Sequence, residues 1–266
     1  MKAGISTACF FPMEMEEALH KLGQQGIDLC ECFFNTPSEL KTGSVRRLKA
    51  AAAFYGMEIR SVHPFHSEME TFFFFTDYKN RMEDGLEIYS RYYEAAAELG
   101  AKYLIFHGDF SVSRCPESLA FEHIHTLWQL GKRYGIELLH ENVGRCKGGQ
   151  PAYLERLHQA IPELGFVLDC KQALRGGHSA MDFVNVLGKQ IKHIHISDST
   201  AESDCVPPGK GIFDFRELFS SLKRRGADPD AVVELYSNSF KQVEELVDSR
   251  NFTQMIMDYV DKHCEN

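Results

Sequence analysis

The strongest constraint on the fold is a regular alternation of short apolar runs with longer amphipathic segments along the 266-residue chain. Eight runs are rich in β-branched and aromatic residues, as expected for strands that are buried on both faces. They occupy residues 2–10, 26–34, 58–66, 101–110, 136–143, 165–173, 191–199 and 230–237. Helical patterns fill the gaps between the runs, and several of them end at a glycine, which suits a helix C-terminus.

Eight strand–helix units predict an α/β protein with a closed (β/α)8 barrel, the TIM barrel, in a single domain over residues 1–266. The alternation requires parallel strands joined by right-handed crossovers, and about 250 residues is the usual size of such a barrel. An open, doubly wound sheet is the alternative. No Gly-x-Gly-x-x-Gly motif follows the first run, which argues against that alternative.

Composition and charge exclude several classes of protein. Hydrophobic residues make up 44% of the chain and charged residues 25%, which is typical of a globular protein. The formal net charge of −9 argues against binding to nucleic acid or to an anionic membrane surface, and no apolar run is long enough to span a membrane. The eight cysteines form no Cys-x-x-Cys pair, which favours reduced thiols in a cytoplasmic protein.

Ionisable residues stand late in seven of the eight predicted strands. They are Glu31, His63, His107, Glu141, Asp169, His195 and Glu234. Such a barrel has its active site at the C-terminal ends of its strands. Because a charged group in a buried strand is costly unless it is paired or bound to a metal, this set predicts a metal centre at that end of the barrel.

The residue types in the set indicate which metal it suits. Glu141, Asp169, His195 and Glu234 offer three carboxylates and one imidazole, an oxygen-rich set that favours Mn²⁺, with Mg²⁺, Co²⁺ or Zn²⁺ as alternatives. His63 and His107, from neighbouring strands, could bind a second ion such as Zn²⁺ or could contact the substrate.

Two further strand histidines are expected to be structural. His193 shares the parity of His195 but lies one layer deeper in the barrel, where a buried imidazole is usually part of the core. His140 has the opposite parity from Glu141, because successive side chains of a strand face opposite sides.

Several segments together resemble the xylose isomerase-like TIM-barrel superfamily, which contains sugar and sugar-phosphate isomerases and epimerases and the endonuclease IV type of DNA-repair enzyme. The matching segments, in order, are SVHPFH, LIFHGD, LLHENV, GFVLDCKQA, HIHISDS, PPGKGIFDF and VVELY. The resemblance implies that Glu141, Asp169, His195 and Glu234 are the four shared metal ligands. It implies that His63 and His107 match the histidines with which the endonucleases bind an additional zinc ion, and that Glu31 matches an acid often seen at the end of strand two. Glu31 is therefore, with these two histidines, a candidate for contact with a second metal ion or the substrate.

The sequence also departs from the family pattern. Gln172 stands where many members have a histidine three residues after the strand-six aspartate. The stretch 206–208, Val-Pro-Pro, replaces the Asp-x-His pair of the endonucleases, so the ligands of a third zinc ion are missing. Ala201 lies near the place of an arginine found in some ketose epimerases, which leaves the sugar undetermined.

We therefore predict a divalent-metal-dependent sugar or sugar-phosphate isomerase or epimerase. A proton is removed from the carbon next to a carbonyl, and the metal ion stabilises the enediolate that forms. Glu141 and Glu234 are the candidates for moving the proton. The alternatives are an endonuclease IV-like phosphodiesterase, a lyase or dehydratase that uses the same metal site, and a non-enzymatic barrel that senses a ligand.

Basic and aromatic loop residues are candidates for contacts with a substrate or a partner. Lys210, Arg145 and Lys171 lie in or near loops after strands five to seven, and could bind a phosphate or a carboxylate or could be solvated surface charges. The loop after the third strand contains Phe72–Phe75, which could form a lid, could contact another subunit of a homodimer or homotetramer, or could be buried beneath the chain's own helices.

Overall fold

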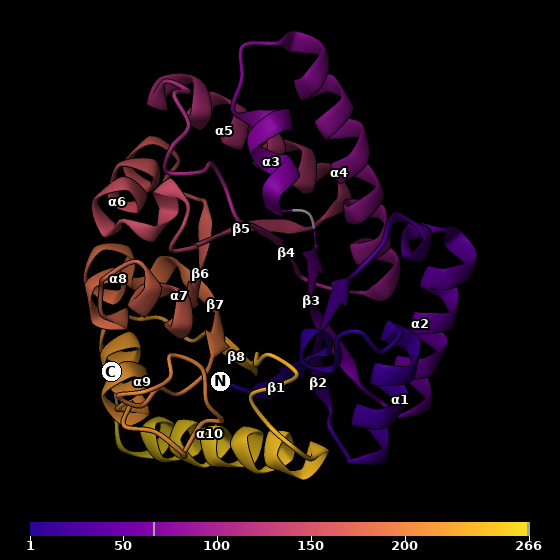
Figure 1. The fold of residues 1–266 in the computed structure, drawn as a ribbon, viewed down its shortest axis with the longest axis vertical. Coiled ribbons are helices and arrows are strands. Elements are labelled where there is room, and N and C mark those ends of the chain that lie inside the picture. The colour runs from indigo at the N-terminus through magenta and orange to yellow at the C-terminus, as the bar shows by residue number, and fades with distance from the viewer. Residues whose placement is uncertain (66, 265–266) are drawn as a thin grey trace.

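Eight parallel strands close into a barrel in the order of the sequence, as the computed structural model shows for residues 1–65 and 67–264 (Figure 1). The strands are β1 (Ala3–Ser6), β2 (Leu29–Phe34), β3 (Glu58–Pro64), β4 (Tyr103–Phe106), β5 (Glu137–Glu141), β6 (Gly165–Asp169), β7 (Ile191–Ile196) and β8 (Asp230–Val233). Strand β1 pairs with both β2 and β8, which closes the sheet. The predicted (β/α)8 barrel of a single domain is confirmed.

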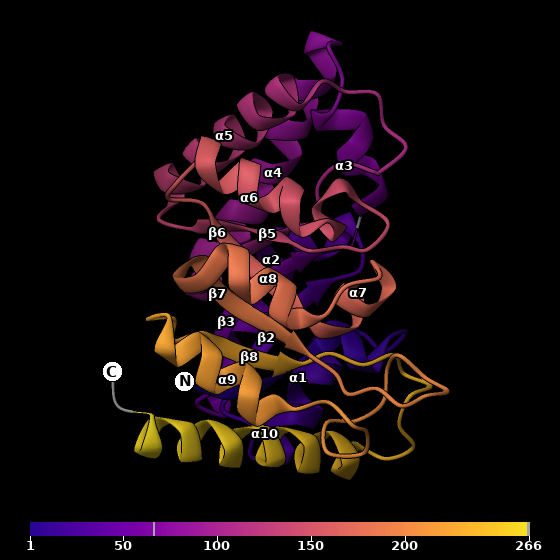
Figure 2. The ribbon, with the colours of Figure 1, turned by 90° about the vertical axis from the view of Figure 1, so that its left-hand side faces the viewer.

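A ring of helices surrounds the strands (Figure 1). Its members are α1 (Met15–Gln24), α2 (Thr42–Phe54), α4 (Lys79–Leu99), α5 (Glu117–Tyr134), α6 (Pro151–Ala160), α8 (Ala180–Leu187), α9 (Phe215–Arg224) and α10 (Val243–His263). Shorter elements are α3 (Ser67–Phe74), α7 (Cys170–Arg175) and the 3-10 helices η1 (Thr7–Phe10), η2 (Pro37–Leu40), η3 (Lys147–Gly149) and η4 (Gly188–Gln190). Figure 2 shows α3 and α7 on the side of the barrel toward which the strands point.

Local signals in the sequence account for the ends of the long helices. Helices α4 and α5 end at Gly100 and Gly135, whose φ angles of +75° and +71° are left-handed and favour glycine. Asp214 caps the start of α9 by accepting a hydrogen bond from the backbone N–H of Glu217. Among the described residues, no helix is both long and apolar enough to cross a membrane.

The core has two parts, which lie outside and inside the barrel wall. A large cluster fills the space between the strands and the helices, whereas Ile105, Leu139 and Val167 pack inside the barrel with Tyr103 at their edge. Side chains two residues further along these strands face the same way, toward the C-terminal mouth of the barrel. All eight cysteines are free thiols, in agreement with the absence of Cys-x-x-Cys pairs.

The structure corrects several details of the predicted secondary structure. The run 2–10 is a strand only over Ala3–Ser6 and continues as η1. The run 165–173 does not continue as a strand, because Asp169 accepts a hydrogen bond from the backbone N–H of Gln172 and caps α7. The segment around Phe72–Phe75 is not wholly a loop but forms α3. Phe74 and Phe75 are buried against Phe106, whereas Phe72 is 55% exposed, so the four aromatic residues are divided between the core and the surface.

The close approach of β1 and β2 requires glycine at position 4. A Cβ atom there would lie 2.4 Å from the carbonyl oxygen of Leu29 in β2. We expect Gly4→Ala to lower the free energy of unfolding by about 1–3 kcal/mol, because the two strands would have to move apart. Gly43→Ala is the control, since its Cβ would meet only the end of the Arg47 side chain at 4.0 Å. Equal thermal midpoints for the two variants, measured by circular dichroism, would contradict this interpretation.

Candidate active site

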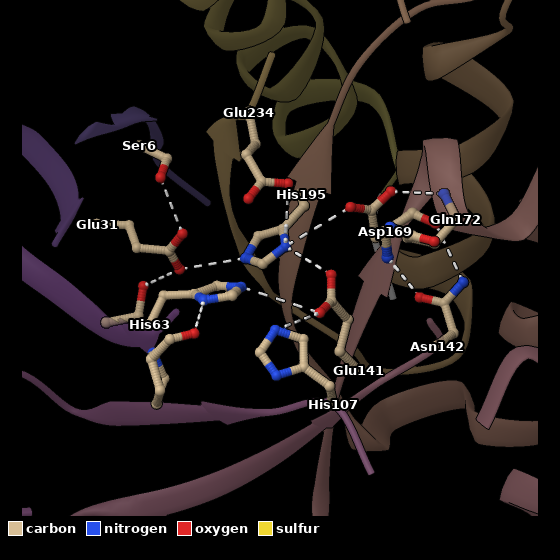
Figure 3. Close-up of polar contacts among 12 residues, drawn as sticks. Ser6, Glu31, His63, His107, Glu141, Asn142, Asp169, Gln172, His195 and Glu234 are labelled. Atoms are coloured by element: carbon tan, nitrogen blue, oxygen red, sulfur yellow. Dashed lines mark hydrogen bonds and ion pairs between the residues drawn. The ribbon is translucent and has the colours of Figure 1, made fainter. Parts of the chain in front are cut away.

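Four of the predicted ligands meet at the C-terminal mouth of the barrel (Figure 3). Glu141 and Asp169 are the last residues of β5 and β6, His195 lies near the end of β7, and Glu234 directly follows β8. One ligand atom of each lies within 4.8 Å of those of the other three, and all four residues are buried. The parity of the strands brings them to one place, because each follows a barrel-interior position by two residues.

The donor atoms of this cluster fit a divalent cation. His195 Nδ1 lies 3.0 Å from Glu141 Oε1, 3.6 Å from Glu234 Oε2 and 3.8 Å from Asp169 Oδ2. Asp169 Oδ2 is buried and has no hydrogen-bond partner, although it faces these charged groups. Three carboxylate oxygens and one imidazole nitrogen, directed at a common point with one oxygen unsatisfied, make up the kind of set that binds Mn²⁺, Zn²⁺ or a similar ion.

Burial and neighbouring charges separate the acidities of the cluster. Burial raises the pKa of each carboxyl group. At Glu141, a hydrogen bond from His195 and the positive charge of its ring outweigh burial, and the pKa of Glu141 is below its usual value. The charges of Lys171 and His195 outweigh burial at Asp169 and hold its pKa well below the usual value. At Glu234 burial dominates, and its pKa is raised. The three carboxylates are therefore unequal, and Glu234 is the weakest acid of the three.

Glu31 lies beneath His195 and is fully buried, so it does not line the cavity. Its Oε2 atom is 3.1 Å from His195 Nε2 and accepts a 2.7 Å hydrogen bond from Ser61, while Ser6 donates to its Oε1 (Figure 3). A carboxylate in this position fixes the orientation of a histidine whose other nitrogen faces a metal site. His193 is also fully buried and lies 3.5 Å from Glu31, as expected for a core histidine one layer below His195.

His63 and His107 face the other oxygen of Glu141. Their Nε2 atoms lie 3.9 Å and 3.7 Å from Glu141 Oε2. His63 Nδ1 is 3.0 Å from the carbonyl oxygen of Pro64, and His107 Nδ1 is 3.0 Å from Glu70 Oε1. With the proton on Nδ1 in each ring, both Nε2 lone pairs point toward Glu141. The structure thus brings the two histidines to one place, where a second ion or a substrate hydroxyl could bind.

Glu70, on α3, is a functional candidate that the sequence did not reveal. Its side chain is fully buried, and its Oε2 atom accepts hydrogen bonds from the backbone N–H groups of His107 and Gly108. Tyr89 donates a further bond to its Oε1 atom. Burial lowers the pKa of His107, but the charge and hydrogen bond of Glu70 outweigh it and raise that pKa. The only sequence signal for Glu70 was an acidic residue on the apolar face of a short helix. That pattern matches no known functional motif.

A cavity of about 430 Å³ opens above the carboxylates and contains two of the three predicted substrate-binding residues. Lys171 and Arg145 line it together with His63, His107, Glu141, Gln172, Arg175, Glu234 and Tyr236. Lys171 Nζ lies 3.2 Å from Glu234 Oε2 and 3.6 Å from Asp169 Oδ2. Lys210 is exposed, and it is not among the described residues that line this cavity. A substrate contact for Lys210 therefore has no support from the geometry.

The positions that depart from the family pattern have structural partners. Gln172 Oε1 accepts a hydrogen bond from the backbone N–H of Gly144, so it joins α7 to the loop after β5. Val206 pairs with Asp198 through two backbone hydrogen bonds. The Asp198 carboxylate in turn accepts hydrogen bonds from the backbone N–H groups of Gly209 and Gly211, and thereby orders the loop after β7.

Residues 17–254 match the model of the xylose isomerase-like TIM barrel family, and the chain belongs to that family. It is 24% identical to fructoselysine 3-epimerase of Shigella flexneri, over 88% of this chain and 90% of that protein. Among solved structures, it is similar to a D-tagatose 3-epimerase-like protein, with 20% identity, complete coverage of both chains and a TM-score of 0.82. It is also similar to the IOLI protein with a bound zinc atom, with 20% identity, 99% coverage of both chains and a TM-score of 0.74.

The unsatisfied Asp169 oxygen leads to a test of metal binding. We expect the protein, stripped of metal by a chelator, to bind Mn²⁺ in a calorimetric titration. Asp169→Asn should weaken that binding by at least about a hundredfold, because a direct ligand contributes more than the groups behind it. Asp248→Asn, on the exposed side of α10, is the control. Equal affinities of the two variants would remove Asp169 from the ligand set.

The Glu70–His107 contact leads to a second test. Glu70→Gln would place an amide N–H₂ or a weaker acceptor against His107 Nδ1, so we expect the proton of His107 to shift toward Nε2. Nitrogen-15 NMR of the imidazoles would detect this shift, and the free energy of unfolding should fall by about 1–3 kcal/mol. Glu68→Gln, exposed on the same helix, should change neither quantity. An unchanged His107 tautomer in Glu70→Gln would show that Glu70 does not orient the ring.

Proposed function

We propose that this protein is a divalent-metal-dependent sugar epimerase or isomerase. The observation that carries the proposal is the convergence of Glu141 and Glu234, two candidate proton carriers, with Asp169 and His195 around one point in the wall of a cavity. A divalent ion held by these four residues would act as a Lewis acid toward the carbonyl and the neighbouring hydroxyl of a sugar. Mn²⁺ is the ion that we favour for this oxygen-rich set.

The two glutamates can divide the proton transfers between them. Glu141 ends β5 and Glu234 follows β8, and these strands are not neighbours in the barrel. Their carboxylates therefore approach a bound sugar from different directions. If one removes a proton from the carbon beside the carbonyl and the other returns a proton on the opposite face, the result is epimerisation. Transfer between adjacent carbons would instead give isomerisation.

The relatives favour epimerisation over isomerisation. The relative from Shigella flexneri is named a fructoselysine 3-epimerase, and the solved structure with a TM-score of 0.82 is that of a D-tagatose 3-epimerase-like protein. Both names describe inversion at carbon 3 of a ketose or of its derivative. We therefore propose a ketose 3-epimerase type of reaction for this chain.

The cations of the cavity favour an uncharged sugar over a sugar phosphate. Lys171 lies between Asp169 and Glu234, and Arg175 forms a 2.6 Å ion pair with Asp204. The acidic partners offset these positive charges, which therefore attract a phosphate less strongly than unpaired charges would. Arg145 is the remaining arginine in the cavity lining, and its substitution by alanine would test whether an anionic substrate depends on it.

Exchange of hydrogen for solvent deuterium gives a direct test. We expect NMR in deuterium oxide to show deuterium at the carbon beside the carbonyl of at least one ketose in a panel, when Mn²⁺, Co²⁺ or Mg²⁺ is present. Glu141→Gln and Glu234→Gln should each slow this exchange by at least about a hundredfold. Glu202→Gln, on the exposed loop after β7, is the matched control. Metal content should be measured for each variant, to separate loss of metal from loss of a proton carrier.

The same experiment distinguishes the competing reactions. Absence of exchange for every ketose and ketose phosphate in the panel would overturn the proposed function, as would full activity of Glu234→Gln. A product that has lost water would instead identify a lyase or dehydratase. The His63–His107–Glu141 cluster favours a second candidate, a phosphodiesterase, which cleavage of a DNA duplex with an abasic site would support. The net charge of −9 argues against that candidate.

A further inference from the structure

A second cavity of about 430 Å³ adjoins the one above the carboxylates, and its walls are mainly apolar, with four aromatic rings. We name it the aromatic lobe and define it by Ala8, Phe11, Phe33, Phe65, Leu235 and Tyr236. Phe33, Phe65 and Tyr236 line both cavities, as do Lys171 and Glu234. The aromatic lobe is therefore continuous with the place where Glu234 would act on a sugar.

The rings of the aromatic lobe are unusually open to solvent for large apolar side chains. Phe11 is 59% exposed, Tyr236 43% and Phe65 38%. Three exposed rings around one hollow form the kind of patch that marks a binding site on a protein surface. Ligand sites are typically apolar clefts with a few polar groups that fix orientation, and here Lys171 and Glu234 supply such groups at the shared edge.

Neighbouring groups hold two of these rings in place. Phe33 stacks on His63 with 4.5 Å between ring centroids. The Lys171 ammonium lies 4.8 Å from the centre of the Tyr236 ring, and Arg175 donates a hydrogen bond to the Tyr236 hydroxyl. These contacts orient the Phe33 and Tyr236 rings before a ligand arrives, which lowers the entropy cost of binding against them.

We propose that the aromatic lobe binds an apolar, ring-bearing substituent of the sugar, so that the substrate is a substituted ketose, or a glycoside that also carries a keto group, and not a free sugar. This inference rests on the proposed function, because it places the reacting carbons beside Glu234. A free hexose with its reacting carbons beside Glu234 could place a C–H face against Tyr236, but it has no substituent to fill the part of the aromatic lobe around Phe11, which lies outside the cavity above the carboxylates. An aryl or aliphatic ring attached to the sugar would bury apolar area there and would stack on Phe33 or Tyr236.

Two matched pairs of probes test the proposal. The first pair is 1-methylamino- and 1-benzylamino-1-deoxy-D-fructose, which carry the same charge, and the second is methyl and phenyl β-D-glucopyranoside. Each is titrated by calorimetry into the full chain loaded with Mn²⁺. We expect the aryl member of at least one pair to bind about tenfold or more tightly than its partner. Equal affinity within both pairs, or no binding of any probe, would overturn the proposal.

Variants that alter only the aromatic lobe test whether the preference for aryl probes arises there. Ala8 and Phe11 line the aromatic lobe but not the cavity above the carboxylates. Ala8→Leu would occupy part of the aromatic lobe and Phe11→Ala would remove part of its wall, so both should reduce the aryl preference by at least about threefold. Phe54→Ala removes a 78% exposed ring from α2 and should retain the preference. An aryl preference that survives both lobe variants would place the ring elsewhere and would overturn the proposal.

Two further outcomes separate this proposal from others. If a second copy of the chain covers the aromatic lobe, Phe11→Ala would change the mass measured by light scattering and the wild-type protein would show no aryl preference, which overturns the proposal. Deuterium exchange into unsubstituted ketoses without any aryl preference would leave the proposed function standing and reject the aromatic lobe. Aryl preference without deuterium exchange in any ketose or amino-deoxyfructose would retain the aromatic lobe as a binding site and reject the proposed function.

Discussion

The contacts of one imidazole, that of His195, organise the whole site. Its Nδ1 atom faces Glu141, Asp169 and Glu234, while its Nε2 atom lies 3.1 Å from the buried carboxylate of Glu31. Burial lowers the pKa of His195, but the charges of Glu31 and Glu234 outweigh burial and raise that pKa well above its usual value. If the ring turned, a buried carboxylate would lose its charged partner in an apolar environment. The free-energy cost of leaving that carboxylate unpaired keeps the donor atoms aligned.

The same principle extends outward through Glu70 and Glu31. Each is a fully buried carboxylate that accepts several hydrogen bonds, and each contacts the nitrogen of a histidine on the side away from the cavity. Glu70 comes from α3, a helix between β3 and α4, and joins that helix to the backbone after β4. The position of His107 therefore depends on the packing of a segment that is not part of the barrel wall.

The sequence predicted the barrel and the central cluster because both follow from periodicity. Alternating side chains place Glu141, Asp169 and His195 on the inner face once the strands are parallel and in register. The same parity correctly separated His140, whose ring packs beside Phe106, from Glu141. Glu70 and the position of Lys210 could not be predicted in this way, because they depend on how loops and a short helix fold back over the barrel. The sequence placed Glu31 with the residues at the mouth of the barrel. In the structure it lies one layer deeper, opposite Ser6 of β1 and Ser61 of β3 in the strand register.

Different strands supply the ionisable side and the aromatic side of the barrel mouth. The ends of β4 to β7 present His107, Glu141, Asp169 and His195. In contrast, Phe11 follows η1, the short helix after β1, and Phe33 is the next-to-last residue of β2. Strand β8 belongs to both sides, because Glu234 is followed two residues later by Tyr236. Glu234, Leu235 and Tyr236 all line the aromatic lobe, so one short segment after β8 joins the acids to the aromatic wall. Substitutions at Ala8 or Phe11 can therefore alter what the cavity accepts while the ligand atoms on β5 to β7 stay in place.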